Sequence, residues 1–351
     1  MILSAFHLGF PLSGITMVKQ DQGHEQQNPQ KQQEEPRGYF NLRTKTLGGM
    51  QFWTDVRSVQ NWRIQRNVKT GHHRLLDPTN LRHAWGNRPH CDLKMNELIT
   101  AGTVKPHRGK VVIVLHGMIR TRNSMQALTA HLSRSGEYEV INFQYASTRE
   151  KVAKHSADLK QLVDSLGEEV TEINFVGHSL GNIVVRHYLG LNQSAADKRI
   201  ATVQGDKRIK RIVMIGPPNQ GSKLARTLNM SALYKAIAGA SGTQLSDAKQ
   251  WEQLKPELAT PQVEFGIIAG GQDEGAMTNF VLNGKDDFTV AVEETKLPGA
   301  SDFLVHPLLH GTMMHQEVTL DATLNFFRHG YFNTKETKNP LPREEKGNPQ
   351  R

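Results

Sequence analysis

The pentapeptide GHSLG, residues 177–181, lies between the apolar stretch INFV at 173–176 and the stretch NIVVRHY at 182–188. A chance G-x-S-x-G arises about once per 3,000 positions at ordinary Gly and Ser frequencies, so a chain of this size carries one by accident roughly one time in ten. The pentapeptide alone therefore leaves open whether Ser179 is a nucleophile or part of a glycine-bounded turn.

The segments on either side of the pentapeptide favour the first interpretation. Residues 173–176 predict a buried strand, and the apolar positions that follow predict a helix with one buried face: Leu180, Ile183, Val184 and Tyr188. A sharp strand–turn–helix brings its backbone against its neighbours, which explains a glycine on each side of the serine. This is the setting of a nucleophile elbow, so we expect Ser179 to be a nucleophile.

The same alternation of strand and helix continues along the chain. The run VVIVL at 111–115 is apolar and β-branched, as in strands buried on both faces of a parallel sheet. Further strands are predicted at 138–143, 209–215, 263–269 and 303–305, and helices at 122–135, 150–166, 180–190 and 316–329. This order predicts an α/β fold with a mostly parallel central sheet and helices on both faces.

The sequence also suggests where the domain begins and ends. WRIQRNV at 62–68 and HRLLD at 73–77 flank the turn signal KTG, which predicts a β-hairpin in an N-terminal extension over 40–100. Gln, Glu, Lys and Pro dominate near both ends, so we expect a disordered or targeting segment at 1–39 and a disordered basic tail at 333–351. The domain is then 40–332, with 217–261 as a candidate cap.

Charge and cysteine content limit the classes of partner. The net charge is +9, but the basic residues are dispersed and no nucleic-acid motif is found, so we expect no nucleic-acid partner. A solvated surface, or one that contacts an anionic membrane, fits this charge. The single cysteine, Cys91, cannot form an intrachain disulfide and is expected to be a partly buried structural thiol.

Targeting and cofactor signals are weak. The first 18 residues resemble an imperfect signal peptide and a poor membrane span, and with the single cysteine they favour the cytoplasm. The 16 histidines include no H-E-x-x-H spacing, and no Gly-rich phosphate loop is found, so we expect neither a metal nor another cofactor. Oligomeric state does not follow from the sequence.

The motifs together resemble those of α/β-hydrolases of the serine lipase and esterase kind. The resemblance spans about residues 109–330 and rests on VVIVLHGM at 111–118, GHSLG at 177–181, GPPNQGS at 216–222, DFTV at 287–290 and LPG at 297–299. It implies the α/β-hydrolase fold and a triad that follows the chain order Ser, acid, His.

Several residues compete for the base and the acid. The base must follow Ser179, and His310, in the loop after the 303–305 strand and downstream of LPG as the resemblance implies, is preferred to His315 and His306. His329 closes the last helix and fits a C-terminal helix cation better. The acid candidates are Asp273, Asp286 and Asp287; the family's Asp-Gly-x-Val favours Asp287, although DFTV lacks the glycine.

An acyl transfer also needs donors for the oxyanion. The N–H group of Leu180, directly after the nucleophile, is one candidate. By resemblance, the second is the N–H group of Met118, with Gly117 allowing close backbone approach and His116 shaping the loop rather than acting as base.

Three hypotheses of function follow. The first is a serine hydrolase that cleaves a small acyl ester or a lipid through an acyl-enzyme on Ser179, with a role in lipid metabolism. The second keeps the triad in an acyltransferase, thioesterase or amidase. The third is a non-catalytic binding protein on the same fold.

Overall fold

The computed structural model describes residues 41–191, 205–222, 232–271, 287 and 289–343, all within one compact unit, Tyr39–Arg351. Its main sheet has six strands in the order β10-β9-β8-β7-β5-β6, and every pairing between them is parallel. The parallel sheet expected from the sequence is confirmed. Its strands are β5 (Gly109–Leu115), β6 (Glu139–Phe143), β7 (Val170–His178), β8 (Ile209–Ile215), β9 (Glu264–Gly270) and β10 (Asp302–His306).

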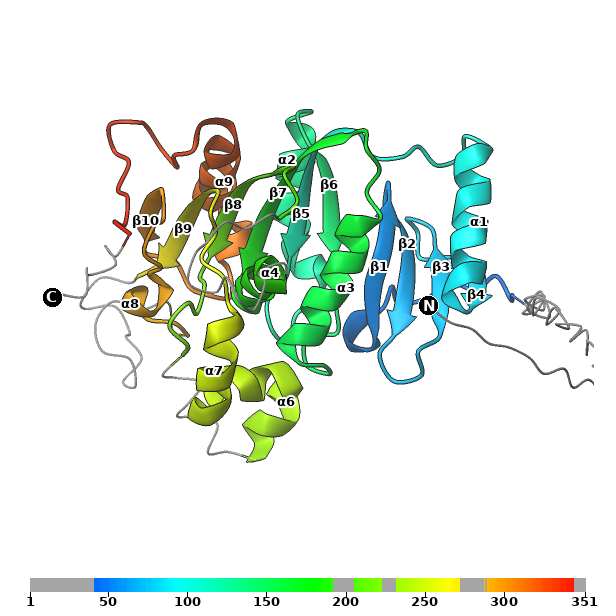
Figure 1. Ribbon diagram of the computed structural model, residues 1–351, viewed down its shortest axis with the longest axis horizontal. Coiled ribbons are helices and arrows are strands. Elements are labelled where there is room, and N and C mark those ends of the chain that lie inside the picture. Colours follow the sequence, from blue (N-terminus) through cyan, green and yellow to red (C-terminus); the bar gives the residue numbers. More distant parts are fainter. Residues whose placement is uncertain (1–40, 192–204, 223–231, 272–286, 288, 344–351) are drawn as a thin grey trace, which may run out of the picture. The chain divides into compact units, whose positions relative to one another are not determined.

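Helices cover both faces of this sheet, as expected (Figure 1). Alternate side chains of β5 serve the two faces: Val111 and Ile113 join one core cluster and Val112 the other. The first cluster includes α3 (Val152–Asp164) and α4 (Leu180–Leu191), and the second includes α2 (Gln126–Arg134) and α9 (Glu317–His329). Shorter elements are η2 (Arg122–Met125), α6 (Ala232–Ser246), α7 (Ala248–Leu254), η3 (Lys255–Glu257), α8 (Val292–Thr295) and η4 (Met313–His315).

The N-terminal extension is a separate four-stranded antiparallel sheet in the order β1-β2-β3-β4. The expected hairpin is confirmed, since β2 and β3 pair with Arg66 opposite His73. One helix, α1, was not expected; Cys91 and Met95 on it are buried against this sheet, and burial raises the pKa of the Cys91 thiol to about 12. The elements are η1 (Met50–Phe52), β1 (Trp53–Val59), β2 (Trp62–Asn67), β3 (His73–Leu76), β4 (Arg82–Gly86) and α1 (Arg88–Thr100).

The expected disordered tail at 333–351 is wrong for residues 333–343. Leu341 N–H donates to Ala300 O and Leu341 O accepts from Gly299 N–H, at 2.9 and 2.8 Å. Asn339 N–H donates to the buried carboxylate of Asp302, at 2.8 Å. The polar composition of this segment gave no sign of these hydrogen bonds, because backbone groups form them whatever the side chains are. No helix within the described ranges is long and apolar enough to span a membrane.

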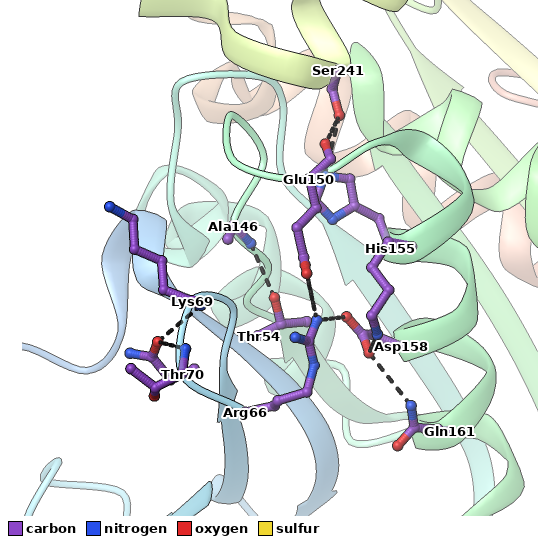
Figure 2. Close-up of polar contacts among 12 residues, drawn as sticks. Thr54, Arg66, Lys69, Thr70, Ala146, Glu150, His155, Asp158, Gln161 and Ser241 are labelled. Carbon is purple, nitrogen blue, oxygen red and sulfur yellow. Dashed lines mark hydrogen bonds and ion pairs between the residues drawn. The ribbon is translucent and has the colours of Figure 1, made fainter. Parts of the chain in front are cut away.

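Ionic contacts join the extension to the main sheet (Figure 2). The Arg66 guanidinium of β2 donates to both carboxylate oxygens of Glu150 at 2.9 Å and to Asp158 of α3 at 2.7 Å. Asp158 is fully buried and also accepts from Lys154, at 2.5 Å. Because a buried carboxylate must be paired, these contacts fix the extension against α3.

A stack of buried rings lies between the main sheet and α3. The rings of His116 and Tyr145 stack at 4.2 Å, and His155 contacts Tyr145 edge-on at 4.9 Å. His155 Nε2–H donates to Ser241 Oγ of α6, whose hydroxyl donates to Glu150 O (Figure 2). Burial lowers the pKa of His116 to about 4 and that of His155 to about 3, so both imidazoles are neutral in the fold.

We predict that Arg66→Met lowers the free energy of unfolding by about 2–4 kcal/mol, because it leaves the carboxylate of Asp158 buried with Lys154 as its remaining cation. Denaturant unfolding measures this. The matched control is Lys160→Met, which removes an exposed pair with Asp164 and should change stability by less than about 0.5 kcal/mol. Equal effects of the two substitutions would contradict the role given to Arg66.

The buried histidines predict a loss of stability in mild acid. Above pH 6.5 both imidazoles are neutral in the folded and in the unfolded protein. Below pH 6.5 they become protonated in the unfolded protein, whereas in the folded protein they stay neutral down to about pH 4 for His116 and about pH 3 for His155. Each should cost about 2 kcal/mol at pH 5. His155→Gln, which can keep the bond to Ser241, should flatten the fall in unfolding free energy between pH 6.5 and 4. The control is His329→Gln, at an exposed position on α9, and it should keep the wild-type slope.

Candidate active site

Ser179 occupies the turn between β7 and α4, at the carboxyl edge of the main sheet. Its φ is 54°, in the left-handed region that non-glycine residues seldom adopt. Its N–H donates to Ile215 O at the end of β8, at 2.9 Å, which holds the turn against the sheet. A Cβ on Gly181 would lie 2.8 Å from Leu115 O, so only glycine lets α4 start this close to β5. Ser179 therefore has the backbone setting of a nucleophile elbow.

Asp287 and His310 lie together, although 23 positions separate them in the chain. His310 Nδ1 is 2.7 Å from Asp287 Oδ2, and His310 N–H donates to Asp287 O at 2.9 Å. Asp287 is fully buried, and its Oδ1 accepts from the amides of Thr289 and Val290, at 2.9 and 2.7 Å. These contacts hold the carboxylate facing Nδ1, which leaves Nε2 of His310 as the ring nitrogen turned away from it.

Contacts with β7 and β8 bring the His310 ring to the edge where Ser179 lies. His178, directly before Ser179, donates from Nε2 to His310 O at 2.9 Å, and the two ring centres are 4.7 Å apart. Gly216, directly after β8, would carry a Cβ only 3.0 Å from His310 Nδ1. The ends of both strands thus pack against His310.

The other histidines considered from the sequence are placed differently. His306 ends β10 and is partly buried, with its pKa lowered by that burial. His315 lies in η4 and is exposed, and His329 ends α9 and stacks on Tyr331. Of the three acid candidates, Asp287 lies within the described residues and contacts His310. Asp273 and Asp286 lie outside the described residues.

The loop after β5 passes directly over the elbow. A Cβ on Gly117 would lie 3.2 Å from Ser179 Cβ and 2.8 Å from His178 Nδ1. His116 is fully buried: its Nδ1–H donates to Gly117 O at 2.9 Å, and its Nε2 accepts from Tyr145 N–H at 3.4 Å. Both nitrogens of His116 are thus engaged by backbone groups, as expected for a residue that shapes the loop.

The two expected oxyanion donors come from different segments: Leu180 directly follows Ser179, and Met118 belongs to the loop after β5. Leu180 is the first residue of α4, where an N–H group has no carbonyl one turn earlier within the helix. Met118 follows Gly117 in the loop that reaches the elbow. A Cβ on Gly242 of α6 would lie 2.8 Å from Met118 Sδ, so the candidate cap contacts the Met118 side chain.

Two residues that the sequence analysis did not select support the site. His178 is the variable residue before the serine in G-x-S-x-G, and its position alone signals that it ends a strand beside the nucleophile. Asn182 lies in the first turn of α4, and its Nδ2 donates to Ser179 O and Ile215 O, each at 3.2 Å. Asn182 therefore braces the turn.

Comparison with known protein families gives a match that includes Ser179 and the loop after β5. A family model described as a domain of unknown function, DUF7379, matches residues 81–240. The comparison with curated proteins finds no match.

Among solved structures, the mature lipase BlEst2 of Bacillus licheniformis is 15% identical with a TM-score of 0.46, and the similarity covers 64% of this chain and 94% of that one. Phospholipase PlaB from Legionella pneumophila is 18% identical with a TM-score of 0.40, over 54% of this chain and 45% of that one. Est1E from Butyrivibrio proteoclasticus, solved with ferulic acid bound, is 16% identical with a TM-score of 0.43, over 64% and 91%.

The fold itself is decided by features of this chain. Its main sheet is parallel, with helices on both faces and a strained serine between an interior strand and the helix that follows it. Asp287 and His310, which contact each other, follow that serine in the chain. The chain therefore has the α/β-hydrolase fold of the kind that serine lipases and esterases share.

Proposed function

We propose that this protein is a serine hydrolase that cleaves carboxylic esters through an acyl-enzyme on Ser179. The observation that carries the proposal is the buried pair of Asp287 and His310, joined at 2.7 Å and packed at the same sheet edge as the elbow serine. A serine hydroxyl needs a neighbouring base, and a histidine held by a carboxylate is the group that supplies one near neutral pH.

In this proposal His310 Nε2 takes the proton of Ser179 Oγ as the oxygen attacks the ester carbonyl. The Asp287 carboxylate stabilises the imidazolium that forms and keeps the proton on Nδ1. The proton then passes from Nε2 to the leaving alcohol, which departs as the acyl group stays on Ser179. Water, activated by the same imidazole, attacks the acyl-enzyme and releases the acid.

Negative charge collects on the carbonyl oxygen in both steps. The N–H groups of Leu180 and Met118 are the proposed donors to it, because the first opens α4 and the second follows the loop at Gly117 that reaches Ser179. The N-terminal end of the α4 dipole adds to this stabilisation.

The substrate class is an acyl ester, either small or lipid-like. A thioester, an amide or an acyl acceptor other than water would use the same groups, and a panel of esters, thioesters and amides assayed side by side separates these activities. Turnover of none of them by the folded protein would favour a binding protein on this fold.

We predict that Ser179→Ala and His310→Ala each lower kcat for an activated ester by about 10⁴-fold or more, because each removes a group that the acylation step requires. Initial rates on a soluble p-nitrophenyl ester measure this. His306→Ala and His315→Ala are the controls and should retain activity within a few-fold. If His315→Ala is inactive and His310→Ala is active, the assignment of the base is wrong.

For Asp287→Asn we expect a fall in kcat of about 10³–10⁴-fold with little change in KM, since an amide cannot stabilise the imidazolium or hold the required tautomer. The amide oxygen can still accept from Thr289 and Val290, so the thermal unfolding midpoint should stay close to that of the wild type. A kcat near the wild-type value in this folded variant would remove Asp287 from the triad.

A further inference from the structure

The two faces of the extension sheet differ in composition: one is a buried apolar face, and the other carries aromatic and cationic side chains. On one face Val56, Ile64 and Leu75 pack with Cys91 and Met95 of α1. Figure 1 shows α1 beside β3 and β4. Side chains alternate along a strand, so Arg74, next to Leu75, turns to the other face. This second face carries Trp53, Arg74 and Trp85.

Within the described chain, the segment before β1 lies across this second face. Gly48 O accepts from Arg63 at 3.1 Å and from Gln65 at 3.0 Å, which fixes the segment on the sheet. Its large apolar side chains nevertheless point to solvent: Leu47 is 86% exposed, Met50 50% and Phe52 40%. Together with Trp53 and Arg74 they line an open hollow of about 570 Å³. Exposed apolar side chains gathered in this way mark an interaction surface.

Cations lie over the aromatic rings of this surface. The Arg74 guanidinium is 3.8 Å from the Trp53 ring centre, and Arg149 and Lys69 are 4.8 and 5.5 Å from that of Phe52. Arg82 lies 4.8 Å from the ring centre of Trp85. We call this set the aromatic–cation patch: Leu47, Met50, Phe52, Trp53, Lys69, Arg74, Arg82, Trp85 and Arg149.

The exposed cations of the patch are Lys69 and Arg149, whereas Arg74 is only 7% exposed and donates to Gln65 Oε1 at 2.8 Å. Among the described residues, no carboxylate forms an ion pair with Lys69, Arg74, Arg82 or Arg149. The nearby Asp55 is fully buried and bonded to Gln65, and Glu150 is paired with Arg66. The patch therefore combines two exposed cations that form no ion pair among the described residues, Lys69 and Arg149, with tryptophans and exposed aliphatic side chains.

This combination fits one partner chemistry best. Anionic headgroups attract clustered cations, tryptophan settles at the lipid–water boundary, and exposed leucine and methionine gain by entering the acyl region. A nucleic acid could contact the cations and the aromatic rings, but it has no apolar region in which Leu47 and Met50 would be buried. We propose that the aromatic–cation patch docks this protein on the surface of a membrane that contains anionic lipid.

The segment that carries part of the patch also contacts the loop that follows Met118. Gln51 donates from Nε2 to Arg120 O at 2.7 Å and accepts from Thr148 N–H at 3.1 Å, so it ties the patch to the loop that follows Met118. Ile119 in that loop is 48% exposed. Docking would thus bring the loop beside Ser179 towards the lipid. The docking proposal does not depend on the proposed hydrolase activity, because membrane binding is measured without turnover.

The test is co-sedimentation of the full-length protein with vesicles of phosphatidylcholine containing about one third phosphatidylglycerol, against vesicles of phosphatidylcholine alone. The wild type should sediment with the anionic vesicles and stay in the supernatant in the presence of the neutral vesicles. Each basic residue near such a surface contributes roughly a fivefold factor, so Lys69→Glu with Arg149→Glu should weaken binding by at least about 25-fold. Leu47→Ser with Met50→Ser should weaken it by about tenfold or more.

Matched controls lie away from the patch. Arg134→Glu with Lys335→Glu changes the net charge equally at exposed positions, and Leu93→Ser removes an exposed leucine from α1; these variants should bind like the wild type. Ser179→Ala should bind vesicles fully even if it is inactive, and the patch variants should keep their rate on a soluble ester. Equal loss in controls and patch variants, or no wild-type binding to anionic vesicles, overturns the proposal. A dimer in solution that Leu47→Ser dissociates, or binding to single-stranded DNA in place of vesicles, does so too.

Discussion

The close approach of the β7–α4 turn to the end of β5 is the constraint on which the site depends. Gly181 lies against the backbone of Leu115 and His116, and this contact forces Ser179 into a left-handed conformation at the sheet edge. Backbone in this region costs about 1–3 kcal/mol at a non-glycine residue and persists only when its surroundings hold it there. Here the amide of Ser179 is bonded to β8 and Asn182 braces the turn, so the strain is supported by the sheet itself.

Many polar groups around the candidate site are buried and hydrogen-bonded, although His155 Nδ1, His178 Nδ1 and Asn182 Oδ1 have no hydrogen-bond partner among the described residues. Burial keeps His116 and His155 neutral; His116 Nδ1–H donates to Gly117 O in the loop next to the serine, and His155 Nε2–H donates to Ser241 of α6. Ser241 links His155 to Glu150, which in turn faces Arg66 of the extension (Figure 2). Extension, α3 and candidate cap therefore share one set of contacts, and the Tyr145 ring lies between His155 of this set and His116 in the loop over Ser179.

The sequence predicted the parallel sheet and the hairpin because short sequence patterns indicate both features. A continuous apolar run indicates a strand buried on both faces, and a turn signal between two strands indicates a hairpin. It ranked His310 first among four histidines, and the contact with Asp287 now supports that order without testing the role. DFTV lacks the glycine of the family pattern, and the carboxylate of Asp287 is nevertheless held by the amides of Thr289 and Val290. Helix α1 was missed because its apolar residues are not spaced on one face, and residues 333–343 were missed because their order comes from backbone bonds to the main sheet. The patch was invisible for another reason: it joins residues up to about 100 positions apart, and only the fold brings Arg149 to Phe52.

The central claim is that Ser179 forms a covalent acyl-enzyme, and mapping a trapped adduct tests it most directly. The protein is treated with a fluorophosphonate, digested, and analysed by mass spectrometry for the modified peptide. The account predicts a single phosphonylated peptide that contains Ser179, with labelling slowed strongly in His310→Ala. An unmodified Ser179 peptide from folded, fully treated protein, or a label on another residue, would contradict it.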